Sequence, residues 1–192
     1  EQPLGEVKPF LPMFSTTVVI TECLTTYMLY AHFRSSRRAF LAALSGASLF
    51  VAIMATVQLL VFPGVFADAG LLGAGPQSAV WVWTFWHGGY PAFVLLALLL
   101  LTPRVARLRA TVQSGLAHAL LLLAAGVAIV LALLAVMDDG VLPPLIDGVV
   151  YTGLLQSPAA PIVLALNVGA LFACIAITRV RDLLSAWLAV VL

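Results

Sequence analysis

Charged side chains are scarce in this chain of 192 residues. Lysine, arginine, aspartate and glutamate together make up 9% of it, whereas 63% is hydrophobic and the mean hydropathy is +1.13. Soluble domains carry about 25% charged residues. The composition therefore excludes a soluble fold and indicates an integral membrane protein.

Cysteine is also rare. Cys23 and Cys174 both fall inside apolar runs, where a free thiol behaves as a small hydrophobic group. No spacing of cysteine or histidine matches a metal or redox motif. We therefore expect no metal site in this chain.

Long apolar runs dominate what is present. Crossing a bilayer takes about 20 apolar residues, and five runs are about this long. A sixth run begins at Leu183 and has only ten residues up to Leu192. The sequence predicts an all-α integral membrane protein, a polytopic bundle with five full transmembrane spans and a truncated sixth. The five runs lie at about 12–33, 39–62, 78–102, 111–136 and 159–178.

The arginines predict the orientation of these spans. All eight follow the first, third or fifth span, whereas the loops 63–77 and 137–158 contain no lysine or arginine and carry four aspartates. Positively charged loops stay in the cytoplasm. We expect the arginine-bearing loops to be cytoplasmic and the other two loops to be external.

The two ends of the sequence predict a longer parent protein. The orientation above leaves the N-terminal segment external although it shows no signal-peptide pattern, which is most simply explained by a further span upstream. Ten residues after Leu183 would leave a helix end in the middle of the bilayer. We expect residues 1–192 to be one transmembrane domain of a protein with at least seven spans.

Three polar side chains are predicted to lie at similar depth. At 1.5 Å per residue, Glu22 lies about 15 Å and His87 about 13 Å from the external ends of their spans. Asn167 lies at a similar depth, about eight residues into its span. Glu22 belongs to a polar stripe with threonines at 21, 25 and 26, which should face other helices. These groups either bind a ligand or form interhelical hydrogen bonds of about 1 kcal/mol each.

The most unusual stretch is 81–91, which reads WVWTFWHGGYP. Trp81 and Trp83 lie near the external interface, where tryptophans commonly form belts. Trp86 and Tyr90 lie too deep for that role. They are expected to wall a cavity or to pack in the core.

The same stretch is expected to bring another helix or a ligand close. Gly88 and Gly89 remove two side chains, which permits close approach. Pro91 frees the His87 carbonyl from its usual donor one turn later. The predicted ligand-binding set is accordingly His87, Glu22, Trp86, Tyr90, Trp83, Asn167 and Thr25.

Other functions stay open on the residues alone. A haem- or quinone-binding redox protein is the main alternative, but two haem-ligating histidines should lie at one depth, and His118 and His32 lie deeper than His87. A transporter would normally show internal repeats, which this sequence lacks. Haem, lipid and quinone are the candidate cofactors.

Three motifs in order resemble the fourth class of bacterial membrane-associated sensor (MASE-type) domains. They are LVFPGVF at 60–66, GLLGAGPQ at 70–77 and WTFWHGGYP at 83–91. Further agreement comes from Glu22 with Thr25, from the HFR sequence at 32–34, and from the loop LPPL at 142–145 that leads to Tyr151. The resemblance covers essentially the whole chain.

The resemblance implies a sensory input module rather than an enzyme. Such modules precede cytoplasmic output domains, commonly diguanylate cyclases with a GGDEF motif and sometimes histidine kinases. Neither output is present in this sequence. The implied partners are membrane lipids, the protein's own output domain and a second copy in a homodimer, with no nucleic acid.

Overall fold

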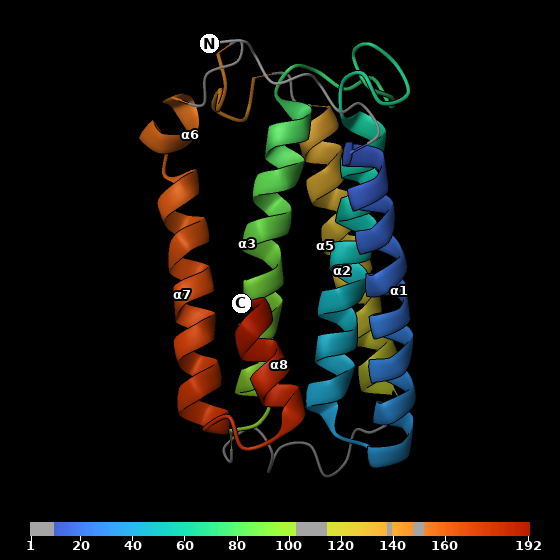
Figure 1. Cartoon of the computed structure of the whole chain (residues 1–192), viewed down its shortest axis with the longest axis vertical. Helices are drawn as coiled ribbons and strands as arrows, with labels where there is room; N and C mark the ends of the chain where they lie inside the picture. Colours follow the sequence, from blue (N-terminus) through green and yellow to red (C-terminus); the bar gives the residue numbers. More distant parts are fainter. Residues whose placement is uncertain (1–9, 103–114, 138–139, 148–151) are drawn as a thin grey trace.

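The computed structural model describes residues 10–102, 115–137, 140–147 and 152–192. Its regular structure is helical, as the sequence predicts (Figure 1). The helices are α1 Phe10–Ser36, α2 Ala39–Val61, α3 Ser78–Leu99, α5 Gly115–Val136, α6 Thr152–Gln156, α7 Ala159–Thr178 and α8 Leu183–Val191.

Four of these helices, α2, α3, α5 and α7, are long and apolar enough to cross a membrane. The bounds of α2, α3 and α7 agree with the predicted second, third and fifth runs within three residues. Helix α5 corresponds to the fourth run, whose predicted start at 111 lies outside the described residues. The predicted span at 12–33 is also helical, but α1 is not among the four. Its threonines and Glu22 make it less apolar, so five full spans are not confirmed.

The helices stand side by side with α2 at the centre. It packs against α1, α3 and α5, whereas α3 packs against α2, α5 and α7, and α8 lies beside α7 (Figure 1). We call the end with the loops 62–77 and 140–147 the loop end, at the top of Figure 1. The opposite end carries Arg34, Arg37, Arg38, Arg179 and Arg181 and is called the arginine end.

Small residues let α2 and α5 approach closely. A Cβ atom on Gly46 would lie 3.2 Å from the backbone oxygen of Leu120. The buried face of α5 consists of alanines, at positions 117, 124, 128, 132 and 135. In membranes, where lipid tails are as apolar as leucine, such small faces allow the backbone contact that holds helices together.

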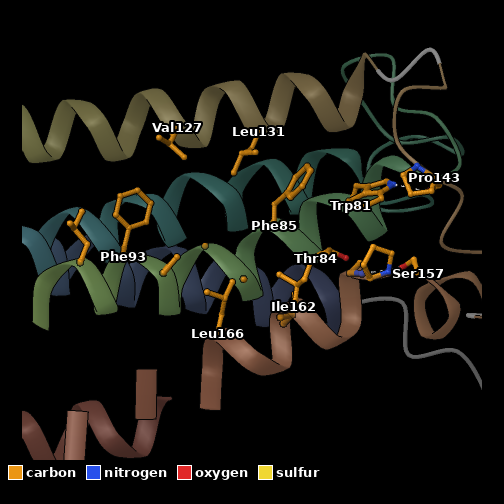
Figure 2. A pocket seen from close by; sticks show the side chains of 17 residues that line it. Trp81, Thr84, Phe85, Phe93, Val127, Leu131, Pro143, Ser157, Ile162 and Leu166 are labelled. Carbon is orange, nitrogen blue, oxygen red and sulfur yellow. Dashed lines mark hydrogen bonds between the residues drawn. The ribbon is translucent and has the colours of Figure 1, made fainter. Parts of the chain in front are cut away.

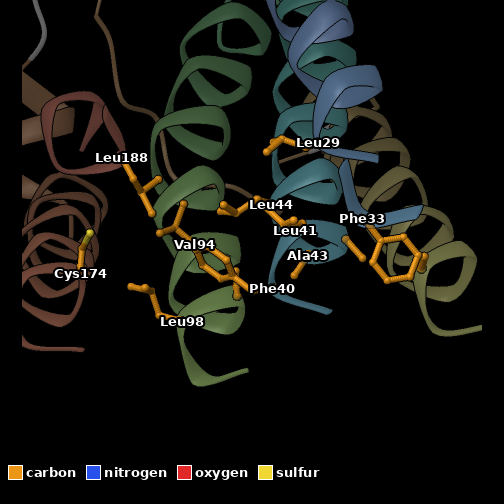
Figure 3. Close-up of a cluster of buried hydrophobic side chains, with 13 residues drawn as sticks. Leu29, Phe33, Phe40, Leu41, Ala43, Leu44, Val94, Leu98, Cys174 and Leu188 are labelled. Carbon is orange, nitrogen blue, oxygen red and sulfur yellow. The ribbon is translucent and has the colours of Figure 1, made fainter. Parts of the chain in front are cut away.

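The short helix α8 turns back into the bundle from the arginine end. Arg179 and Val180 adopt left-handed backbone conformations, with φ of 53° and 50°, which reverses the chain. Asp182 caps α8 by accepting a hydrogen bond from the Ser185 backbone N–H, and this bond holds the pKa of Asp182 below its usual value. The fully buried Leu188 then joins Val94 and Leu98 of α3 in one apolar cluster (Figure 3).

The two loops of the loop end are joined by Gln77 and Trp81. The Gln77 side chain donates to the Ile146 carbonyl at 2.8 Å and accepts from the Leu145 and Ile146 N–H groups at 2.9 and 3.2 Å. The Trp81 indole donates to the Pro143 carbonyl at 3.1 Å. Two of the motif segments recognised in the sequence, 70–77 and 142–145, are therefore physically connected.

Candidate functional site

Five of the seven predicted site residues line one cavity of about 240 Å³. They are Glu22 of α1, Trp86, His87 and Tyr90 of α3, and Asn167 of α7. Val18, Val51, Pro91 and Val191 complete its wall, so α1, α2, α3, α7 and α8 all contribute. We call this space the polar cavity. The similar depths predicted for Glu22, His87 and Asn167 agree with their meeting here.

Glu22 carries the carboxyl group of the polar cavity. The side chain of Ser48, in α2, lies close to this carboxyl group. Oxygen Oε2 is buried and has no hydrogen-bond partner within the described part of the chain. A buried carboxylate oxygen without a partner carries a large desolvation cost. Oε2 is therefore an unsatisfied hydrogen-bond acceptor at the polar cavity.

His87 has a defined tautomer in this geometry. Its Nδ1 lies 2.8 Å from the Trp83 carbonyl oxygen, and because a carbonyl can only accept, Nδ1 carries the proton. In the neutral ring, Nε2 is then left with a lone pair. The ring stacks on Trp83, with centroids 4.1 Å apart, and lies 4.8 Å from the ring of Trp86.

Asn167 satisfies the carbonyl that Pro91 leaves without a donor. Pro91 has no N–H, so the His87 carbonyl one turn earlier lacks its helical hydrogen bond. The Asn167 side-chain nitrogen, from α7, donates to this carbonyl at 3.1 Å and to the Val163 carbonyl at 2.8 Å. Both amide hydrogens are thereby used, which leaves the amide oxygen as the group's remaining hydrogen-bonding atom.

Trp86 and Tyr90 wall the polar cavity as half-buried aromatics. Neither the indole N–H of Trp86 nor the hydroxyl of Tyr90 forms a hydrogen bond among the residues that the structure describes. Both rings also pack against the apolar cluster around Phe50 and Met54. The two roles expected for these residues, wall and core, are therefore combined.

Two predicted site residues lie outside the lining. The Thr25 hydroxyl donates to the Thr21 carbonyl of its own helix at 2.8 Å. Trp83 is 40% exposed and acts indirectly, since its carbonyl and ring hold His87. Thr21, expected to face other helices, is exposed; its hydroxyl is satisfied by the Thr17 and Val18 carbonyls and needs no other helix.

Sequence reasoning missed Ser48 and Val191. A serine inside a span is a polar signal that could have been found, and Ser48 is indeed 2% exposed. Val191 is apolar among apolar neighbours and gives no signal in the sequence. Its place in the lining is a consequence of the chain reversal before α8.

The other histidines lie apart from this cavity. His118 is 3.1 Å from the Tyr30 hydroxyl of α1, and His32 is exposed; neither lines the polar cavity. In the described ranges, no group of three or more His, Cys, Asp or Glu residues is placed to hold a metal ion. A pair of axial haem histidines is not assembled around His87.

Gly88 and Gly89 do permit close approach. A Cβ atom on Gly88 would lie 3.4 Å from Cγ2 of Val163 in α7, and one on Gly89 would overlap the ring of Phe50 in α2. The two glycines also line a second cavity, of about 640 Å³, between α3, α5 and α7 (Figure 2). We call it the apolar cavity.

Among the described residues that line the apolar cavity, every polar side chain has a hydrogen-bond partner. Thr84 donates to the Val80 carbonyl, Ser157 to the Leu154 carbonyl and Trp81 to the Pro143 carbonyl, the last shown as a dashed line in Figure 2. The rest of its wall is hydrocarbon and backbone, including Phe85, Phe93, Val127, Leu131, Ile162 and Leu166. Such a space can take hydrocarbon but cannot fix the orientation of a polar ligand.

Comparison with known proteins bears on the whole chain. No curated protein and no solved structure was found to match it. Residues 5–192 match the family model MASE4, described as a membrane-associated sensor, integral membrane domain. The resemblance carried by the three motifs is confirmed: this chain belongs to the MASE4 family of membrane-associated sensor domains.

Proposed function

We propose that this chain is the sensory input domain of a bacterial signal-transduction protein, and that occupancy of the polar cavity controls a cytoplasmic output domain. The family supports the sensory role. One observation carries the rest: the cavity is walled by residues of α1, α2, α3 and α7 and by Val191 of α8. A ligand in it would touch the helix that comes last in the sequence.

Signal transfer in this proposal is a change in helix packing. A ligand that fits one arrangement of α3, α7 and α8 better than another shifts the population between them. The output domain would be a diguanylate cyclase with a GGDEF motif or a histidine kinase, acting as a homodimer. Residues 1–192 would contain no catalytic group and would act only through helix movement.

The proposed topology places α1 across the membrane as well. Its 27 residues extend about 40 Å at 1.5 Å per residue, more than the hydrocarbon thickness, and it packs along α2. With the arginine end in the cytoplasm, the loops 63–77 and 137–158 would face outward from the inner membrane. The polar cavity would then open within the bilayer-embedded part of the protein.

The test uses the full-length protein with its own output domain, in membranes. We expect Glu22→Gln and His87→Ala to change output activity between about 5-fold and 150-fold, the range of typical coupling energies. Thr25→Val is the matched control on α1, because Thr25 lies outside the lining. Normal signalling by both cavity variants, with insertion intact, would reduce the cluster to interhelical hydrogen bonds.

A haem- or quinone-binding redox protein is the alternative that the same preparation tests. His87 Nε2 is the atom that could bind a haem iron. An ultraviolet-visible spectrum of the purified protein would show such a group directly. A pigment that is lost in His87→Ala would favour the redox function over the sensory one.

A further inference from the structure

The hydrogen-bonding groups of the polar cavity define the chemistry of its ligand. We infer that this ligand is a small organic cation whose ammonium group donates a hydrogen bond to the carboxylate of Glu22. The inference rests on the proposed sensory function, because it names the kind of ligand that would be sensed. Four properties of the cavity carry it: its charge, its open acceptors, its aromatic walls and its size.

Charge is the first property. The polar cavity contains one carboxyl group, and no lysine or arginine among the described residues lines it. The described arginines are at the arginine end, in turns and helix ends. No ion pair joins Glu22 to His87 in the described residues. A carboxyl group taken out of water is either protonated or needs a positive partner to stay ionised, and a cationic ligand supplies that partner.

The second property is the direction of the open hydrogen bonds. Glu22 Oε2 has no donor, His87 Nε2 has a lone pair once Nδ1 donates to Trp83, and both Asn167 amide hydrogens are used. The Trp86 indole N–H and the Tyr90 hydroxyl also line the cavity as open donors, but Glu22, His87 and Asn167 leave only acceptors. A primary ammonium carries three N–H donors and no acceptor, which is the complement of this set.

Aromatic walls are the third property. Trp86 and Tyr90 both line the cavity together with Glu22. A cation over the face of such a ring is attracted to it, with tryptophan the best partner. The combination of a carboxylate with two aromatic rings therefore favours a positively charged group over a neutral donor of the same shape.

Size is the fourth property. The polar cavity encloses about 240 Å³, below the range of about 300–1,000 Å³ that suits drug-sized ligands. It also exceeds the space of a single water molecule, about 30 Å³. The ligand is accordingly a compact amine of a few carbon atoms, and water molecules alone are the competing occupant.

The experiment titrates the purified full-length protein with ethylammonium, tetramethylammonium and ethanol while tryptophan fluorescence is recorded. We expect a saturable response to ethylammonium and a weaker one to tetramethylammonium, which has the charge but no N–H. Ethanol, which matches ethylammonium in shape without its charge, should bind at least tenfold more weakly. Trp86→Phe should remove most of the signal and assign it to the cavity.

Three variants make the assignment specific. Glu22→Gln keeps the size of the side chain and removes its charge, so ethylammonium affinity should fall at least tenfold. Ser48→Ala removes a polar side chain close to Glu22 and leaves the charge, so affinity should be kept. Thr25→Val should bind as the unmodified protein does, and circular dichroism should show unchanged helix content in all three.

The outcomes separate this inference from the proposed function. Equal responses to ethanol and ethylammonium, equal binding by Glu22→Gln, or no saturable response to either cation would each overturn the ammonium ligand and point to water or a neutral molecule. If Glu22→Gln still alters output activity in that case, the sensory function stands. If it alters neither binding nor output, both proposals fail.

Discussion

The polar cavity and the apolar cavity lie on different faces of one helix. Trp86, His87 and Tyr90 of α3 line the first, whereas Gly88 and Gly89, between them in the sequence, line the second. Neighbouring residues on a helix point about 100° apart, so one short segment serves both spaces. Each cavity therefore meets a different face of α3, and the polar cavity gains further polar groups from Glu22 of α1 and Asn167 of α7.

The two cavities also differ in how far their polar atoms are hydrogen-bonded. In the apolar cavity the hydroxyls of Thr84 and Ser157 and the indole of Trp81 all donate to nearby carbonyls. In the polar cavity Glu22 Oε2 is left without a donor. A cavity whose polar side chains are all hydrogen-bonded within the protein suits hydrocarbon. A cavity with an unsatisfied acceptor favours a ligand that donates a hydrogen bond.

The largest expected effect comes from closing the space at Gly89. Gly89→Val should overlap the Phe50 ring and force α2 and α3 apart, which costs about 1–3 kcal/mol or more and damages the walls of both cavities. A lower melting temperature in detergent is the measurement. Gly169→Ala is the control, because no atom lies within 4 Å of its added Cβ. Equal melting temperatures for the two variants would contradict this packing.

The hydrogen bond between Asn167 and the His87 carbonyl gives the next effect. Asn167→Ala should cost about 0.6–1.7 kcal/mol, the range of single interhelical hydrogen bonds in membranes. Pro91→Ala adds an N–H that can bond the same carbonyl within α3. The double variant should therefore unfold at a higher denaturant concentration than Asn167→Ala alone. Additive losses would show that the two residues do not share this carbonyl.

A variant of Gln77 would test how the loop end covers the apolar cavity, because Pro143 of the loop 140–147 lines that cavity. Gln77→Ala removes three hydrogen bonds to residues 145 and 146. Amide hydrogen exchange should become about tenfold faster there, as expected for about 1.4 kcal/mol of lost protection. Exchange within α5 should not change. Unchanged exchange at Leu145 and Ile146 would mean that the remaining hydrogen bonds, from Trp81 to Pro143 and from Leu154 to Leu145, are enough to hold the loop.

The smallest effect is expected from filling the apolar cavity. Ala92 lines it and is exposed, so Ala92→Phe can reduce its volume with little strain. Ethylammonium binding should stay within twofold of the unmodified protein, because the polar cavity lies on another face of α3. Ala165→Phe, on α7 outside both linings, is the matched control. A large loss of binding in Ala92→Phe alone would show that the two cavities are coupled.

Sequence reasoning located the helices well because apolar runs and breakers mark them directly. Glu22, His87 and Asn167 were found for a related reason: a polar residue stands out in an apolar span, and 1.5 Å per residue fixes its depth. Rotation about the helix axis is harder to infer. Thr25 follows Glu22 by three residues, yet its hydroxyl bonds its own helix.

The apolar cavity had a weaker signal. Gly88 and Gly89, which predicted the close approach of another helix or a ligand, line it. Most of the remaining wall consists of apolar residues of the kinds that fill every span of this chain. Val191 joined the polar cavity only through the left-handed backbone at Arg179 and Val180, two residues whose types do not favour that conformation. Features that arise from packing, with no polar or glycine marker, stay hidden in the sequence.

The hydrogen bond from Asn167 to the His87 carbonyl has a consequence for evolution. The amide at 167 supplies a donor that the proline at 91 withholds. A relative with an ordinary amino acid at 91 would bond that carbonyl within its own helix, and selection for an amide at 167 would relax. The two positions, 76 residues apart, should therefore be inherited as a correlated pair.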